Sequence, residues 1–384
     1  MAVSVLLALG LVELGLRTVP PPQGYFTLVP GAEWTLSPTA HALPGIEGES
    51  HTRINHFGVR GRMFGDDAKE FRILAVGGST TLCSALDDSE VWTHLVETGL
   101  DTTSDGRHVW VGNVGRDGAT TRDHVLHLKY LLPQYPRIDV IVSLIGVNDM
   151  TAAVHQGWSY RARPDVTEPA AERAQLAHAF AVFPGLGRDQ GRYGDEAVAW
   201  YRRTALWQLA RRVKQTWEHW RLDSRRVSEE RLDRFRRERA AATTWIDSLP
   251  PLEAPLAEYR QNLNAMASAA SAAGVHLVFV TPPTAWRAGM TRADQRLLWF
   301  GPMQGPTGTT RAYFTPDALS RAMQRYNETT LAVCHERHLD CLDAAALIPH
   351  DSTTMYDDVH FNERGSQLLA RALIAFFRDR APFR

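Results

Sequence analysis

The residues most able to do chemistry in this sequence are a serine and an acid–histidine pair. Ser79, in the segment GGST, carries a hydroxyl that becomes a nucleophile once a base takes its proton. Asp357 and His360, in DDVHF, are three residues apart, and in a loop or tight turn this spacing lets a carboxylate reach an imidazole and set its tautomer. Ordinary explanations exist for both segments. Ser79 could cap a helix, and DDVHFN could be a turn in which Asn362 caps the next helix.

Two other segments carry donors for the negative charge that develops when a hydroxyl attacks a carbonyl. GNVGRDGATT contains Gly115 and Gly118, and a glycine lets its backbone N–H approach a ligand closely. GVND contains Asn148, whose neutral amide can donate a hydrogen bond. Taken singly, a glycine turn and an asparagine cap explain these segments equally well. The order Ser79, glycine, Asn148 and Asp-x-x-His along one chain favours a shared site.

The elements that must position these residues alternate between strands and helices. Apolar runs predict strands over residues 71–78, 108–115, 138–146, 275–283 and 339–342. Helical stretches are predicted over residues 88–100, 120–132, 257–274, 316–335 and 363–377. This alternation predicts an α/β fold with a parallel sheet covered on both faces. Ligands bind outside the carboxyl ends of such strands, where three of the candidate segments lie, and the Asp-x-x-His pair comes just before the last helix.

A long insertion is predicted between the third and fourth strands, over about residues 151–252. Its middle is helical, with an apolar face formed by Leu206, Leu209, Val213, Trp217 and Trp220 and an opposite face rich in arginine. One interpretation is a basic amphipathic helix lying on a membrane surface. The other, which we favour, is a helical subdomain that packs its tryptophans on the core and covers the cleft.

Charge and cysteine content narrow the functional classes. The formal net charge is −1, so the basic excess of a nucleic-acid-binding protein is absent. There is no CxxC pair to indicate a zinc or thioredoxin-like site. Cys334 and Cys341 could form a disulfide if the chain leaves the cytoplasm, or they could be two small buried residues beside a turn.

Residues 1–22 form an apolar segment that contains Glu13 and ends in three prolines. It is shorter than the roughly 20 apolar residues that span a bilayer, and it lacks the basic start of a secretion signal. A short membrane anchor, a signal peptide and a buried helix are the three interpretations, and we favour the anchor. Residues 23–70 are then an N-terminal extension, and 71–384 the main domain.

With these segments in view, the sequence resembles the GDSL/SGNH hydrolase superfamily. GGST, NVGRDG, GVND and DDVH are similar to the four sequence blocks of that superfamily, although Gly78 stands where many members have aspartate. The resemblance favours Gly118 over Gly115 as the oxyanion glycine and Asp357 over Asp358 as the orienting acid. The upstream segment RINHFGVRG is similar to membrane-anchored bacterial members.

The resemblance implies a flavodoxin-like three-layer α/β/α fold with a central parallel sheet of about five strands. It implies a catalytic triad of Ser79, His360 and Asp357, an oxyanion hole made by Ser79, Gly118 and Asn148, and no metal or other cofactor. The expected substrate is an ester-bearing small molecule, lipid or glycan, cleaved outside the cytoplasm by a membrane-attached or secreted protein. Acyl transfer to a glycan hydroxyl, and a non-catalytic role in envelope assembly, are the alternatives.

Several residues next to these segments are given no catalytic role. Asp149 is expected to hold its loop by hydrogen bonds. Met355 and Tyr356 are expected to line the cleft. The aromatic residues after the fourth strand could form a substrate wall, but buried packing is the commoner fate of such side chains; they are Trp286, Trp299 and Phe300.

Overall fold

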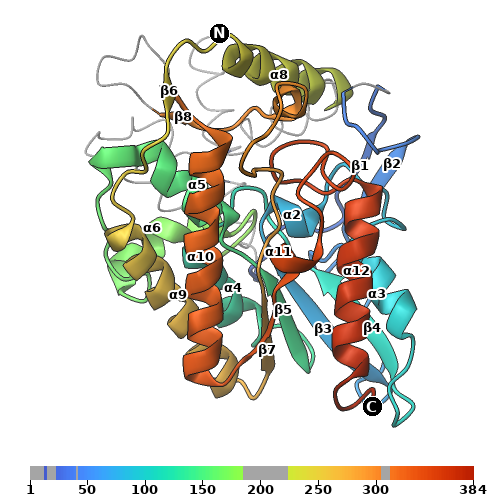
Figure 1. Cartoon of the computed structure of the whole chain (residues 1–384). Coiled ribbons are helices and arrows are strands. Elements are labelled where there is room, and N and C mark those ends of the chain that lie inside the picture. The colour runs from blue at the N-terminus through green and yellow to red at the C-terminus, as the bar shows by residue number, and fades with distance from the viewer. Residues whose placement is uncertain (1–12, 15–22, 40–41, 185–223, 304–311) are drawn as a thin grey trace, which may run out of the picture.

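The computed structural model describes residues 13–14, 23–39, 42–184, 224–303 and 312–384 (Figure 1). Its centre is a five-stranded sheet in the order β10-β7-β5-β3-β4, and every neighbouring pair of strands is parallel. The strands are β3 (Glu70–Gly77), β4 (His108–Asn113), β5 (Val140–Leu144), β7 (His276–Val280) and β10 (Asp340–Leu342). Numbered along the chain, this is the flavodoxin-like order 2-1-3-4-5, so the predicted fold class is confirmed.

The two central strands β3 and β5 are buried along their whole length because both faces of the sheet are covered. All eight residues of β3 and all five of β5 are buried, as expected for parallel strands between two helical layers. One layer holds α3 (Trp92–Leu100) packed on α12 (Glu363–Arg378). The other holds α9 (Glu253–Ala272), which packs on both α4 (Thr121–Leu131) and α10 (Pro316–Arg337) (Figure 1).

The described part of the insertion between β5 and β7 is mainly helical. It contains α5 (Val147–Gln156), the short 3-10 helix η1 (Gly157–Ser159), α6 (Pro169–Ala179), α8 (Ser224–Ala240) and the two-residue strand β6 (Trp245–Ile246). The apolar face predicted around Leu206–Trp220 falls within 185–223, outside the described residues. Its two interpretations therefore stay predictions.

A second excursion, which the sequence analysis did not predict, connects β7 to α10. It contains the short 3-10 helix η3 (Asp294–Leu297) and the strands β8 (Pro302–Met303) and β9 (Ala312–Phe314). Strand β9 pairs with β6 on one side and with β8 on the other. The two excursions thus join in one small sheet of three strands.

The N-terminal extension contributes a two-stranded antiparallel sheet, β1 (Glu33–Leu36) with β2 (Ser50–Arg53). Most of the predicted anchor, residues 1–12 and 15–22, lies outside the described part of the chain. Within the described part, none of the helices has both the length and the apolar character needed to cross a membrane. Elsewhere in the chain, Cys334 at the end of α10 and Cys341 in β10 are joined by a disulfide with a Cα–Cα distance of 6.2 Å.

Arg60, from the segment RINHFGVRG, connects this extension to the serine segment. Its guanidinium is buried, with the residue 2% exposed. It donates to the carbonyls of Leu82, Cys83 and Leu86 at 2.7, 2.9 and 2.7 Å and to Asp88 Oδ1 at 2.8 Å. The first two carbonyls lie at the end of α2 (Ser79–Leu82), whose last C=O groups have no partner within the helix. Arg60 therefore fixes the short helix that begins at Ser79.

Replacing Arg60 by methionine should strongly destabilise the fold, because it leaves three carbonyls without their buried donor and removes one of the partners of Asp88. We expect a loss of about 3 kcal/mol or more in the free energy of unfolding. Urea unfolding measures it. Arg53→Met is the matched control, since the Arg53 side chain is 69% exposed and binds the same Asp88; its loss should be below about 1 kcal/mol. Equal losses in the two variants would contradict the role given to Arg60.

Candidate active site

Ser79 lies at a sharp turn from β3 into α2, and two glycines make that turn possible. A Cβ on Gly77 would stand 2.1 Å from Thr81 Oγ1 and 2.6 Å from the Leu144 carbonyl. A Cβ on Gly78 would stand 2.5 Å from Asn148 Nδ2. Both positions exclude larger residues unless their neighbours move. The glycine at position 78, where many members of the GDSL/SGNH superfamily have aspartate, therefore leaves room for the Asn148 amide.

The structure brings Ser79, His360 and Asp357 into one chain of hydrogen bonds. Ser79 Oγ lies 2.8 Å from His360 Nε2, across 281 residues of sequence. His360 Nδ1 lies 2.8 Å from Asp357 Oδ2. The other carboxylate oxygen, Oδ1, accepts the backbone N–H groups of Val359 and His360 at 2.9 Å each. The predicted three-residue spacing works because this tight turn directs the carboxylate back onto its own loop.

The two candidate glycines occupy different environments. Gly115 packs against the serine helix, since a Cβ there would lie 2.4 Å from the Leu82 nitrogen. Gly118 is exposed, has open space where a Cβ would stand and adopts a φ of +73°, which glycine reaches without strain. Its turn is fixed by hydrogen bonds from the Ala119 N–H to the Arg116 carbonyl at 3.1 Å and from the Arg116 N–H to the Gly77 carbonyl at 3.0 Å. This geometry favours Gly118 as the ligand-facing glycine.

Asn148 joins this turn to the serine corner from the start of α5. Its Nδ2 donates to the Ala119 carbonyl at 2.8 Å and lies beside Gly78. Asp149 holds the same helix in place, as predicted, because its carboxylate accepts the backbone N–H of Thr121 at 3.1 Å and the Thr121 hydroxyl at 2.6 Å. Burial raises the pKa of Asp149 to about 7, which suits a structural group shielded from water.

Comparison with known proteins places this arrangement in a family. The sequence model of the GDSL-like lipase/acylhydrolase family matches residues 74–368, and the match includes every member of the site just described. The chain belongs to this family. Its members are ester-acting hydrolases, in agreement with the resemblance. A search of curated proteins finds no significant match.

Solved structures that match this chain include esterases. The aryl esterase of Mycobacterium smegmatis is 12% identical, with a TM-score of 0.41, and the match covers 80% of this chain and 99% of that one. The acetylxylan esterase of Geobacillus stearothermophilus is 14% identical, with a TM-score of 0.39 and coverages of 79% and 93%. A putative lipolytic protein of the G-D-S-L family from Desulfitobacterium hafniense is 10% identical, with a TM-score of 0.39 and coverages of 79% and 98%.

Electrostatics in this GDSL-like site favour an imidazolium next to an ionised acid. Burial lowers the pKa of His360, but the charge and hydrogen bond of Asp357 outweigh it, so the pKa is raised from 6.5. Burial raises the pKa of Asp357, but His360 and the backbone N–H groups outweigh it, so that pKa is lowered. The pair therefore stabilises the proton that His360 would receive from a nucleophile.

The sequence did not predict three contacts around the His360–Asp357 pair, although Tyr356 was expected to line the cleft. The ring of Tyr356 stacks on the imidazole, with ring centres 5.5 Å apart and planes 10° apart. Asp117 is exposed next to Gly118, and its charge adds to that of Asp357 in raising the pKa of His360. Trp299 donates its Nε1–H to Asp357 Oδ2 at 3.1 Å. The Asp117 and Trp299 contacts leave no spacing signal, because they depend on where separate segments meet. The Tyr356 stack is local, but its ring geometry depends on the fold of the loop that carries His360.

The other two aromatic candidates, Trp286 and Phe300, pack in or against the protein core. Trp286 is fully buried, and its Nε1 donates to Asp358 Oδ1 at 2.7 Å. It is not part of a substrate wall. Phe300 packs against both tryptophan rings, with centres 5.8 and 5.9 Å away. The side chain of Asp358 binds Trp286 and the backbone of the second excursion, whereas the carboxylate of Asp357 contacts the His360 ring.

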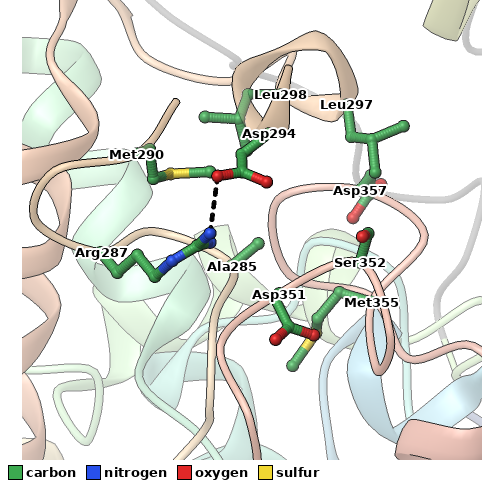
Figure 2. A pocket seen from close by; sticks show the side chains of 10 residues that line it. All are labelled: Ala285, Arg287, Met290, Asp294, Leu297, Leu298, Asp351, Ser352, Met355 and Asp357. Carbon is green, nitrogen blue, oxygen red and sulfur yellow. Dashed lines mark hydrogen bonds and ion pairs between the residues drawn. The ribbon is translucent and has the colours of Figure 1, made fainter. Parts of the chain in front are cut away.

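A small pocket lies beside the acid, shown in Figure 2. Its lining includes Asp357 and the buried Met355, and an Arg287–Asp294 ion pair of 2.7 Å lies in its wall. Among the described residues, neither Ser79 nor His360 lines it. The pocket therefore reaches the acid but not the contact between Ser79 and His360.

Removal of the Asp357 charge should lower the pKa of His360, because the largest stabilising influence on the imidazolium is lost. We expect Asp357→Asn to shift the imidazole titration downward, measured by NMR on the His360 Cε1–H signal. Asp117→Asn should give a smaller shift in the same direction, and Asp379→Asn, at the end of α12, should give none. An unchanged titration in Asp357→Asn would contradict the pairing.

Proposed function

We propose that this protein is a serine esterase that cleaves carboxylic esters, acetyl or longer acyl, through an acyl-serine intermediate on Ser79. The observation that carries the proposal is the continuous link from Ser79 Oγ through His360 to Asp357, with both side-chain contacts at 2.8 Å. Membership of the GDSL-like lipase/acylhydrolase family supports it at the level of the reaction class. The arrangement has the parts of an acyl-transfer site: a nucleophile, a base in contact with it and an acid that orients the base.

The chemistry then runs in two halves. Ser79 Oγ attacks the ester carbonyl while His360 Nε2 takes the hydroxyl proton, and the imidazolium is stabilised by Asp357. As the tetrahedral intermediate collapses, His360 gives that proton to the departing alkoxide, which leaves as an alcohol. A water molecule attacks the acyl-Ser79, with His360 again as base. The carboxylic acid is released, and the Ser79 hydroxyl is restored.

The oxyanion is proposed to bind three donors. Two are backbone N–H groups, from Ser79 at the start of α2 and from Gly118 in its turn. The third is Asn148 Nδ2, which has two N–H bonds. One of them donates to the Ala119 carbonyl at 2.8 Å, which orients the amide, and the other is then available to the oxyanion. A donor held in place before the reaction avoids reorganisation when charge develops.

Loss of the Asn148 donor should slow the chemical step without abolishing substrate binding. We expect Asn148→Ala to lower kcat by about 100- to 1,000-fold with little change in KM, and Ser79→Ala to remove activity. Steady-state hydrolysis of an acetyl ester measures both. Asn264→Ala is the matched control, because that amide also donates to a carbonyl, of Arg260 at 3.0 Å, but within α9; its activity should stay unchanged.

The same assay distinguishes hydrolysis from transfer. Products are analysed with and without added sugar acceptors, and free carboxylic acid should predominate in both cases. Predominant acetylation of the sugar would contradict hydrolysis as the main reaction. Full activity in Ser79→Ala would contradict the proposed nucleophile.

A further inference from the structure

The carboxylate of Asp357 accepts four N–H donors, and one of them comes from another segment of the chain. Val359 and His360 supply their backbone N–H groups, and His360 also supplies Nδ1. The fourth donor is Trp299 Nε1, at 3.1 Å from Oδ2, the same oxygen that contacts His360 Nδ1. Trp299 therefore shares the oxygen that orients the base.

The backbone of Trp299 is held by the neighbouring acid. Asp358 Oδ2 accepts the backbone N–H groups of Trp299 and Phe300 at 2.7 and 3.2 Å. Its other oxygen accepts Trp286 Nε1 at 2.7 Å, and its carbonyl accepts the Ala285 N–H at 2.8 Å. Two consecutive aspartates thus bind this tryptophan, Asp357 at the indole and Asp358 at the main chain.

Helix α8 of the insertion packs against the same part of the structure. The Phe235 ring stacks on the Trp299 ring, with centres 5.7 Å apart and planes 26° apart. The guanidinium of Arg236 donates to three carbonyls, those of Tyr356 at 2.9 Å, Leu297 at 3.2 Å and Ala42 at 2.8 Å. One guanidinium therefore joins the catalytic loop, the second excursion and the N-terminal extension.

We propose that Trp299 is a positioning residue for the catalytic acid, and that helix α8 holds it there through Phe235 and Arg236. The proposal rests on the proposed function, since the acid matters only if His360 acts as a base. It assigns the insertion a role in the reaction that the four sequence blocks do not contain. The indole N–H fixes the rotation of the Asp357 carboxylate and takes up part of the charge on Oδ2.

A positioning role predicts the direction in which the pKa of His360 changes when the indole N–H is lost, whereas a purely space-filling role predicts no such change. A donor on a carboxylate oxygen withdraws negative charge and so weakens the hydrogen bond between that oxygen and another donor. Without the indole N–H, Asp357 Oδ2 would interact more strongly with the imidazolium, and the pKa of His360 would rise. The base must be neutral to accept a proton, so activity would then begin at a higher pH. Looser orientation of the acid would lower kcat rather than raise KM.

The test is Trp299→Phe, which keeps an aromatic ring for the stack and removes the N–H. We expect the His360 titration, followed by NMR, and the acid limb of kcat/KM to move upward by on the order of 0.5 pH unit. We expect kcat to fall on the order of 10-fold with little change in KM. Trp110→Phe is the matched control, because Trp110 is buried and donates to the Arg62 carbonyl at 3.1 Å, far from the acid in sequence; its titration should match wild type.

The outcomes separate this proposal from the esterase assignment. An unchanged His360 titration in folded Trp299→Phe would overturn the positioning role even if the enzyme is active. The titration needs no turnover, so it remains decisive if no ester is cleaved. If Trp299→Phe does not fold, Phe235→Leu takes its place: it keeps the N–H but loosens the stack, and a smaller upward shift is expected. No shift in that variant would overturn the proposal.

Discussion

The burial of a single carboxylate, that of Asp357, is the constraint on which the rest of the site depends. The residue is 3% exposed, and a charge in such a place is costly unless it is paired and hydrogen-bonded. Four N–H donors, one of them on the His360 imidazole, supply that compensation. The donors on Val359 and His360 fix the turn that carries His360, and the donor on Trp299 fixes the second excursion. Helix α8 contacts both segments, through Arg236 and Phe235.

At the other end of this chain of hydrogen bonds, the position of Ser79 depends on close backbone approach rather than on charge. Ser79 can face His360 because Gly77 and Gly78 leave no side chain between β3, the start of α2 and Asn148. Arg60 then binds the carbonyls at the end of that short helix. Ser79 is therefore placed by steric exclusion on one side and by a buried guanidinium on the other, which explains how a helix of four residues holds a defined position.

Sequence reasoning recovered those parts of the fold that have local signals. Buried strands read as apolar runs, and the glycines, Asn148 and the Asp-x-x-His pair follow strands or precede a helix, so their meeting place followed from the topology of a parallel sheet. It could not recover contacts made between distant segments. Trp299 reaches Asp357 across 58 residues and Arg236 reaches Tyr356 across 120. Neither contact leaves a periodic pattern, and both depend on how two excursions from the sheet pack together. The function of Arg60 was hidden for the same reason, because its carbonyl partners lie more than 20 residues away.

The central claim is that Ser79 is a nucleophile activated by His360, and covalent labelling tests it most directly. A fluorophosphonate probe reacts with a serine whose hydroxyl is deprotonated by a neighbouring base, and peptide mapping locates the adduct. The account predicts a single adduct on the peptide that contains Ser79, no adduct in Ser79→Ala, and much slower labelling in His360→Gln. A folded wild-type protein that remains unlabelled, or one labelled on another serine, would contradict it.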